Sequence, residues 1–361
     1  MTTAAPPSPA ADRKADIGLA IILLGVVVRM TATFDPMPAW SGDPFTSAAP
    51  IVGLTPMLSL AVDALVLIGA VFVLASTAGR GRGITLAAAL AGLGIVPAMI
   101  HAWGGQPESL DNTVIASAWL AAIIGGVAAW TACRDQRQLR IAAAVLLGAV
   151  GVLAAKGLVQ NFIDHPETVA MYRQNREAIL AANGWSPDSA MARAYERRLF
   201  NAEATGWFGL SNVYASFMAA AVVGGVALIV FLRLARQPLA KPVLLFALAS
   251  VGAGSTGLLM TGSKGAIAAA MLGAGLLVVA AAVRQIAGPG SRISRRVFGI
   301  GIVAAAVLLP LLGVALMALV PENRASLSLL FRWFYIVGAS RSIIAEPLIG
   351  VGPAGFKEAY Q

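Results

Sequence analysis

Long apolar runs take up most of this sequence, and they constrain its fold more than any other feature. Each run is roughly 18–25 residues long, enough for a helix to cross about 30 Å of lipid hydrocarbon. The short segments of alternating polarity that a membrane-spanning β-barrel requires are absent. Only 12% of the residues are charged, against about 25% in a soluble domain. The sequence therefore predicts an all-α fold, a polytopic transmembrane helix bundle with about nine spans.

The predicted spans divide the chain into five parts. Residues 1–16 form a polar tail, 17–159 a five-span bundle, 160–206 an outer helical loop, 207–320 a four-span core, and 321–361 the start of a large outer loop. The spans themselves are predicted at 17–33, 51–77, 84–102, 113–132, 141–159, 207–232, 243–261, 264–283 and 297–320.

The positions of the basic residues predict the orientation in the membrane. Every second connection between spans is basic, whereas 34–50 and 101–112 contain neither Lys nor Arg. Basic connections stay on the cytosolic side, so we expect a cytosolic N-terminus. This orientation accounts for the net charge of +9, and nucleic acid is not an expected partner.

The outer loop 160–206 has the pattern of two amphipathic helices. The first is expected to begin at Asp164-His165-Pro166 and to end at Asn183-Gly184, and the second to begin at Ser186-Pro187. We expect both to lie on the outer membrane–water boundary. They either roof the bundle or shape a substrate entrance, and the sequence leaves both open.

Four ionisable residues lie within or at the ends of the apolar spans: Arg29, Asp63, Lys156 and Lys264. A charge in hydrocarbon is costly, so each is a candidate functional residue. The three cations are expected near the outer ends of their spans. For Arg29 and Lys156 two other interpretations remain open: the side chain extends to the interface, or it forms a structural ion pair with Asp63.

The segment Thr261-Gly262-Ser263-Lys264-Gly265 separates two apolar spans. Ser263 is a candidate cap for the following helix, and the glycines allow a tight turn. Unpaired N–H groups at that helix start, together with Lys264, predict an outward-facing site for phosphate or pyrophosphate. It is not a P-loop, because the GxxxxGK[ST] spacing is absent. A plain hairpin turn is the alternative.

Three arginines, Arg324, Arg332 and Arg341, follow the last predicted span. On one straight helix, Arg324 and Arg332 lie about 80° apart, while Arg332 and Arg341 point in opposite directions. At most two of the three therefore serve one site, unless the helix bends at Gly338.

Three motifs follow one another in the second half of the chain. They are Gly206-Trp-Phe-Gly-Leu-Ser-Asn212, Ser263-Lys264-Gly265-Ala266, and Arg332 followed by Pro347-Leu-Ile-Gly-Val-Gly-Pro-Ala-Gly-Phe356. Together they resemble the Gly-x-Phe-x-x-x-Asn element, the Ser-Arg-Gly-Ala turn and the proline–glycine signature of the O-antigen ligase and Wzy-type polymerase superfamily. The motifs cover about residues 200–361, and the remainder resembles the family only in topology.

The resemblance implies a glycosyltransferase of the bacterial inner membrane with a periplasmic active face. Such proteins transfer a glycan from undecaprenyl pyrophosphate to lipid A–core oligosaccharide, another glycan or protein, among membrane lipids and with no cofactor or metal. By resemblance, Arg332 and Lys264 take the positions of two family arginines and are predicted to be catalytic, since cations stabilise the leaving pyrophosphate. The predicted ligands of the pyrophosphate or lipid are Arg341, Arg324, Lys156, Arg29 and Ser263.

Two departures from the family pattern bear on activity. Lys264 replaces arginine, so a point charge takes the place of a bidentate phosphate clamp. The family also has a general-base histidine further along the outer loop, and neither His101 nor His165, the two histidines present, matches that motif. His101 is interpreted as a loop residue and His165 as a surface or capping residue. We expect a member truncated within its outer loop.

Two other functions remain open at the level of sequence. A transporter or flippase for an anionic or lipid-linked substrate requires charged groups along a path through the bilayer, and here only Asp63 is deep. A structural or assembly protein without a site is the third interpretation, which the grouping of cations at one predicted membrane face disfavours.

Overall fold

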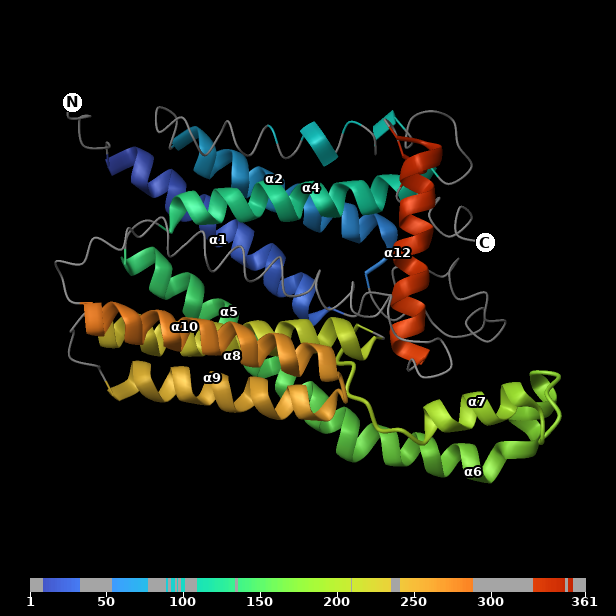
Figure 1. Cartoon of the computed structure of the whole chain (residues 1–361). Coiled ribbons are helices and arrows are strands. Elements are labelled where there is room, and N and C mark those ends of the chain that lie inside the picture. Colours follow the sequence, from blue (N-terminus) through green and yellow to red (C-terminus); the bar gives the residue numbers. More distant parts are fainter. Residues whose placement is uncertain are drawn as a thin grey trace. The chain divides into compact units, whose positions relative to one another are not determined.

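The computed structural model describes residues 9–32, 54–76, 109–133, 136–208, 210–234, 241–287, 327–347 and 350–352, with short stretches between 89 and 100. Every regular element longer than one turn in this part of the chain is helical, as predicted (Figure 1). The elements are α1 (Pro9–Thr31), α2 (Pro56–Ser76), α4 (Ser109–Ala132), α5 (Gln136–Val159), the π-helix η1 (Gln160–Asp164), α6 (His165–Ala182), α7 (Ala190–Leu199), α8 (Ser211–Leu234), α9 (Lys241–Met260), α10 (Lys264–Ala287) and α12 (Leu327–Ala345).

Six helical segments of the described residues are long and apolar enough to cross a membrane, so the chain is a helical membrane protein. They comprise α2, α4, the continuous segment that contains α5, and α8, α9 and α10. These coincide with six of the predicted spans. The prediction for 84–102 falls on residues described only in short stretches, and 297–320 lies outside the described residues. The predicted orientation stays a prediction.

Helix α1 covers the first predicted span but is not one of these six. Charged residues near both ends, including Asp16 and Arg29, leave only Ile17–Val28 without a charge. That stretch is shorter than the about 20 residues that a span needs. Helix α1 can therefore cross the hydrocarbon only if the charged side chains at its ends have ion-pair or hydrogen-bond partners or extend to the interface.

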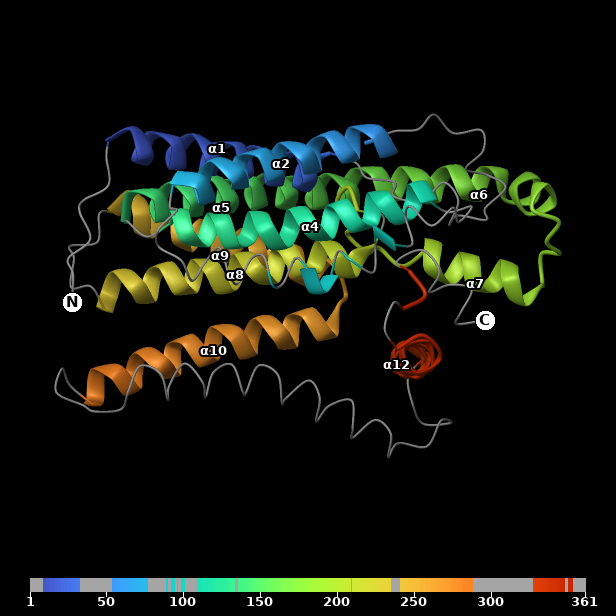
Figure 2. The same ribbon diagram turned by 90° about the horizontal axis from the view of Figure 1, so that it is seen from above.

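The chain divides into two compact units. Unit 1 contains Met1–Arg29, Pro36–Ala142 and Ser294–Gln361, and unit 2 contains Met30–Asp35 and Ala143–Ile293. In unit 1, α2 packs along α4, and α12 lies across their direction (Figure 2). Helices α1 and α2 touch backbone to backbone, because a Cβ on Gly18 would lie 2.5 Å from the carbonyl oxygen of Gly69. Small residues commonly allow such close approach between membrane helices.

In unit 2, α8 is the central helix and packs against both α9 and α10. Its residue Tyr214 is fully buried and donates a hydrogen bond of 3.2 Å to the carbonyl oxygen of Leu153 in α5. One buried phenol thereby joins two apolar helices without leaving its polar atom unpaired.

Helices α5, η1 and α6 run on as one helical segment, Arg137–Ala182, of 46 residues. The backbone of Asn175 is not helical (φ −115°, ψ 18°), and the segment kinks there. At about 1.5 Å per residue, the part before Asn175 alone extends for about 55 Å, nearly twice the thickness of the hydrocarbon. Figure 1 shows α6 continuing the direction of α5, with α7 folded back beside it. We expected both amphipathic helices to lie on the membrane–water boundary, and that placement stays a prediction; the hairpin of α6 and α7 follows the apolar end of α5 along the chain.

The predicted end of the first helix at Asn183-Gly184 is confirmed, whereas the predicted starts of both helices are wrong. The backbone stays helical from α5 through Asp164 into α6, so no new helix begins at Asp164-His165-Pro166. Helix α6 ends at Ala182, shortly before Gly184 with φ +66°. Helix α7 begins at Ala190, because the hydroxyl of Ser189, and not Ser186, accepts a hydrogen bond of 3.1 Å from the N–H of Ala192. Ser186 instead closes a turn, with its carbonyl accepting the N–H of Ser189 at 2.9 Å.

Candidate functional site

A polar surface lies at one end of unit 2, where α5 and α9 finish and α8 and α10 begin. We call it the polar end, and it comprises Lys156–Asp164, Glu203–Gly206, Ser211–Asn212 and Thr261–Lys264. Hydrogen bonds join these four segments, which are far apart in the sequence, so the polar end is a product of tertiary structure.

The turn between α9 and α10 forms the part that the sequence singled out. Gly262 has φ +63°, a left-handed conformation that glycine adopts without strain. The N–H of Ser263 donates to the Thr261 hydroxyl at 3.1 Å, and the Ser263 carbonyl accepts the N–H of Ile267 at 3.1 Å. Ser263 therefore occupies the cap position, but its hydroxyl donates to the Oδ1 atom of Asn212 at 3.0 Å. The first and second motifs thus meet through their side chains.

Lys264 is the first residue of α10, and its side chain is exposed. No ion pair neutralises its ammonium group within the described residues. The first backbone N–H groups of a helix have no partner inside the helix, and the helix dipole adds positive potential there. The geometry suits an anion, although it is equally that of a hairpin turn.

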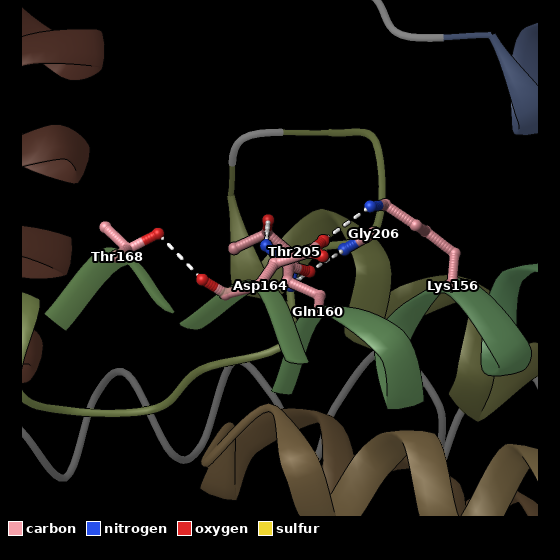
Figure 3. A network of polar contacts seen from close by, with 6 residues as sticks. All are labelled: Lys156, Gln160, Asp164, Thr168, Thr205 and Gly206. Carbon is pink, nitrogen blue, oxygen red and sulfur yellow. Dashed lines mark hydrogen bonds and ion pairs between the residues drawn. The ribbon is translucent and has the colours of Figure 1, made fainter. Parts of the chain in front are cut away.

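Hydrogen bonds of the Gln160 side chain connect the segment before α8 to the end of α5 (Figure 3). Its side-chain oxygen accepts the N–H groups of Thr205 and Gly206, both at 2.9 Å, and its amide donates to the Thr205 hydroxyl at 2.8 Å. The neighbouring N–H of Ala204 donates to the carbonyl of Met260 at 3.0 Å. Sequence reasoning missed Gln160, since only the fold shows which backbone its amide meets.

Lys156 was predicted to bind pyrophosphate, and the structure gives it a carboxylate partner. Its ammonium lies 2.8 Å from Asp164, with side-chain exposures of 28% and 44% (Figure 3). The pair bridges η1, and π-helical turns of this kind are frequent at functional sites. A ligand at Lys156 would have to compete with Asp164.

Arg29 was also predicted to bind the lipid or pyrophosphate, and it pairs with Asp63, one of the alternatives left open by the sequence. The guanidinium lies 2.6 Å from Asp63 and also donates to the carbonyl of Ser59 at 3.2 Å. Ser117 of α4 donates to the other carboxylate oxygen of Asp63 at 3.0 Å. Asp63 is 4% exposed and Arg29 23%. Three helices of unit 1 thereby share one buried charge pair.

The three predicted arginines of the last segment have different outcomes. Arg332 and Arg341 both belong to α12, nine residues apart. Arg341 is exposed, the side chain of Arg332 lies outside the described part of the chain, and so does the whole of Arg324. Helix α12 belongs to unit 1 and Lys264 to unit 2, and a shared site of Arg332 and Lys264 stays a prediction.

The hairpin of α6 and α7 is held by its own contacts. Glu196 accepts hydrogen bonds from Arg176 at 2.6 Å and from the Tyr172 hydroxyl at 2.8 Å. The Arg176 hydrogen bond, and after it that of Tyr172, lowers the pKa of the Glu196 carboxyl. His165 makes a contact of 2.9 Å with the carbonyl of Leu199 through Nε2, as fits a residue that caps the hairpin. His101 lies outside the described residues.

In the part of the chain that the structure describes, no group of three or more His, Cys, Asp or Glu side chains is arranged to hold a metal ion. Comparison with protein-family models, with curated proteins and with solved structures finds no match.

Proposed function

We propose that this chain transfers a glycan from an undecaprenyl-pyrophosphate carrier to an acceptor, lipid A–core oligosaccharide or another glycan, at the periplasmic face of the bacterial inner membrane. The observation that carries the proposal is the exposed ammonium group of Lys264 at the start of α10, beside the contact between Ser263 and Asn212. The three motifs that resemble the O-antigen ligase superfamily support it.

The chemistry follows from charge. When the bond between the sugar and the pyrophosphate breaks, negative charge develops on the leaving phosphate oxygen. A fixed cation stabilises that charge more than it stabilises the ground state, so it accelerates the reaction. Arg29 and Lys156 each already neutralise a carboxylate. The proposal therefore assigns the pyrophosphate to Lys264 and Arg332. Ser263 stays a proposed ligand, and its hydroxyl would have to leave the Oδ1 atom of Asn212 to donate to a phosphate oxygen.

A transporter or flippase remains the competing function, and no contact in the described residues favours it. Asp63, the deep carboxylate, is buried between three helices and is neutralised by Arg29. A path for an ion or a substrate needs charged groups that line a water-filled route.

The test is glycan transfer by the full chain in proteoliposomes, with donor and acceptor on the same side and no ion gradient. We expect Lys264→Ala to lower the transfer rate by about 10²-fold or more, the usual effect of losing one group that stabilises a developing oxyanion. Lys264→Arg should keep or raise the rate, because a guanidinium binds phosphate in a bidentate manner.

Lys241→Ala is the matched control, because Lys241 is also the exposed first residue of a helix, at the opposite end of unit 2. Its rate should stay within about twofold of the wild-type rate, since surface substitutions rarely perturb a distant site. If the double variant with Lys264→Ala and Arg332→Ala transfers the glycan at the wild-type rate, the proposed site is wrong. If the protein instead moves the donor across the bilayer, requires an ion gradient to do so and forms no transfer product, it is a transporter and the proposed function is wrong.

A further inference from the structure

Glu203 is an exposed carboxylate at the polar end of unit 2 that the sequence did not single out. Its Oε1 atom accepts a hydrogen bond of 2.9 Å from the Asn201 amide, and its Oε2 atom accepts one of 2.8 Å from the Ser211 hydroxyl. Within the described residues it makes no ion pair. Asp164, the other carboxylate at this end, is neutralised by Lys156 at 2.8 Å.

Two contacts hold Glu203 beside the turn that carries Lys264. Its neighbour Ala204 donates a backbone hydrogen bond of 3.0 Å to Met260, four residues before Lys264. Its partner Ser211 is followed by Asn212, which accepts the hydroxyl of Ser263 at 3.0 Å. A carboxylate and an ammonium group, each without an ion-pair partner in the described part of the chain, thus flank one short turn.

Glycan transfer needs a group that removes a proton from the acceptor. An alcohol oxygen attacks a sugar carbon efficiently only if its proton leaves during the attack, and a positioned carboxylate can accept it. An ionised carboxylate has about four lone-pair sites. Glu203 uses two of them for Asn201 and Ser211, so two remain for an incoming hydroxyl.

We infer that Glu203 is the general base of the proposed transfer. The acceptor hydroxyl gives its proton to the Glu203 carboxylate while its oxygen forms a bond to the anomeric carbon of the donor sugar. The bond from that carbon to the phosphate oxygen breaks, and its electron pair leaves with the lipid pyrophosphate, beside Lys264. The proton then passes from Glu203 to water. The inference rests on the proposed function.

This assignment gives the base to a residue other than the histidine that the resemblance implies. The described contact of the His165 ring does not point to catalysis, because its Nε2 atom lies 2.9 Å from the Leu199 carbonyl within the hairpin of α6 and α7. Glu203, in contrast, is exposed and lies one residue from the contact with α9.

The experiment compares Glu203→Gln with two matched variants in proteoliposomes, using a radiolabelled undecaprenyl-pyrophosphate-linked disaccharide as donor. Gln has the shape of Glu but does not take up a proton, so we expect kcat to fall by about 10²-fold or more. The Kd for the donor and the Tm should stay unchanged. Glu177→Gln changes an exposed carboxylate on α6 and should keep full activity. Ser211→Ala removes one hydrogen bond to Glu203 and should lower the rate less than Glu203→Gln does.

Chemical rescue separates a base from a structural residue. In Glu203→Ala, added formate should restore part of the rate, because it fills the space with a free carboxylate. Formate should not rescue Lys264→Ala. If Ser211→Ala loses as much activity as Glu203→Gln, or if Glu203→Gln lowers the Tm, Glu203 holds the start of α8 and the inference is wrong.

The failure of this inference is distinguishable from the failure of the proposed function. If wild-type protein transfers the glycan, Lys264→Ala does not, and Glu203→Gln does, the function stands and another group is the base. If wild-type protein neither binds the donor nor transfers the glycan, both proposals are wrong.

Discussion

At the scale of single residues, Asp63 and Asp164 show how burial changes the importance of an ion pair. Each carboxylate has one basic partner, but the Asp63 side chain is 4% exposed and the Asp164 side chain 44%. Water screens the exposed pair, which contributes little to stability. If one member of a buried pair is removed, a charge remains without compensation.

We expect Asp63→Ala to lower the free energy of unfolding by about 2–3 kcal/mol, below the usual range for a buried pair because Arg29 can reach the interface. Asp164→Ala should cost less than about 1 kcal/mol. Reversible chemical denaturation in detergent measures both. The loss of unfolding free energy for Asp63→Asn, whose side chain can still form a hydrogen bond with Ser117, should lie between these two values. Equal losses for Asp63→Ala and Asp164→Ala would contradict the role assigned to burial.

At the scale of elements, the hairpin of α6 and α7 is stabilised by aromatic contacts and hydrogen bonds between its own residues, and it extends beyond the apolar part of α5. Tyr172, Tyr195, Trp185 and Phe200 pack ring against ring, with centroids 5.6–6.0 Å apart. Arg176 and Tyr172 converge on Glu196 at the side of this cluster. The hairpin therefore has a local source of stability that depends on one carboxylate.

The stability of this hairpin should depend on pH. The folded state lowers the pKa of Glu196 below its ordinary value of 4.5, so the folded protein binds the proton less well than the unfolded one. The contribution is complete above that ordinary value and is lost as the pH falls through the lowered value. The protection factors against hydrogen exchange of residues 165–200, taken relative to the intrinsic exchange rate at each pH, should fall in this acid window.

Glu196→Gln should remove that acid dependence, and Glu167→Gln, at an exposed carboxylate of the same hairpin, should leave it in place. Protection factors that fall on the alkaline side, or an acid transition that persists in Glu196→Gln, would show that another group controls the hairpin.

At the scale of the whole molecule, two units each have their own polar contacts within apolar helices. In unit 1 the shared group is the carboxylate of Asp63, and in unit 2 it is the side chain of Gln160. Helix α1 and helix α5 each begin in unit 1 and continue into unit 2.

The predicted orientation is open to a direct test, because Cys133 is the one cysteine of the sequence. In a Cys133→Ser background, a cysteine at Ser186, between α6 and α7, should react with an impermeant maleimide in intact cells. A cysteine at Arg233, in the last turn of α8, should react only after the membrane is opened. The reverse pattern would invert the orientation and exclude a periplasmic site at Lys264.

The sequence by itself determined that the chain is a bundle of membrane-spanning helices, and it located six of them. It could do so because hydrophobicity and length are local properties, and lipid leaves the backbone few structures other than the helix. It also placed the turn at Gly262–Lys264 and the end of α6 at Asn183-Gly184, since glycine allows the left-handed backbone conformation found at Gly262 and Gly184.

Only the tertiary structure decided which polar groups meet. Arg29 pairs with Asp63 across 34 residues, Gln160 binds the backbone 45 and 46 residues away, and Ser263 bonds Asn212 across 51. No local pattern encodes these contacts, because they depend on how helices pack and on which face each helix presents. For the same reason Glu203 went unnoticed in the sequence, although its place beside the Lys264 turn makes it the base in the proposed transfer.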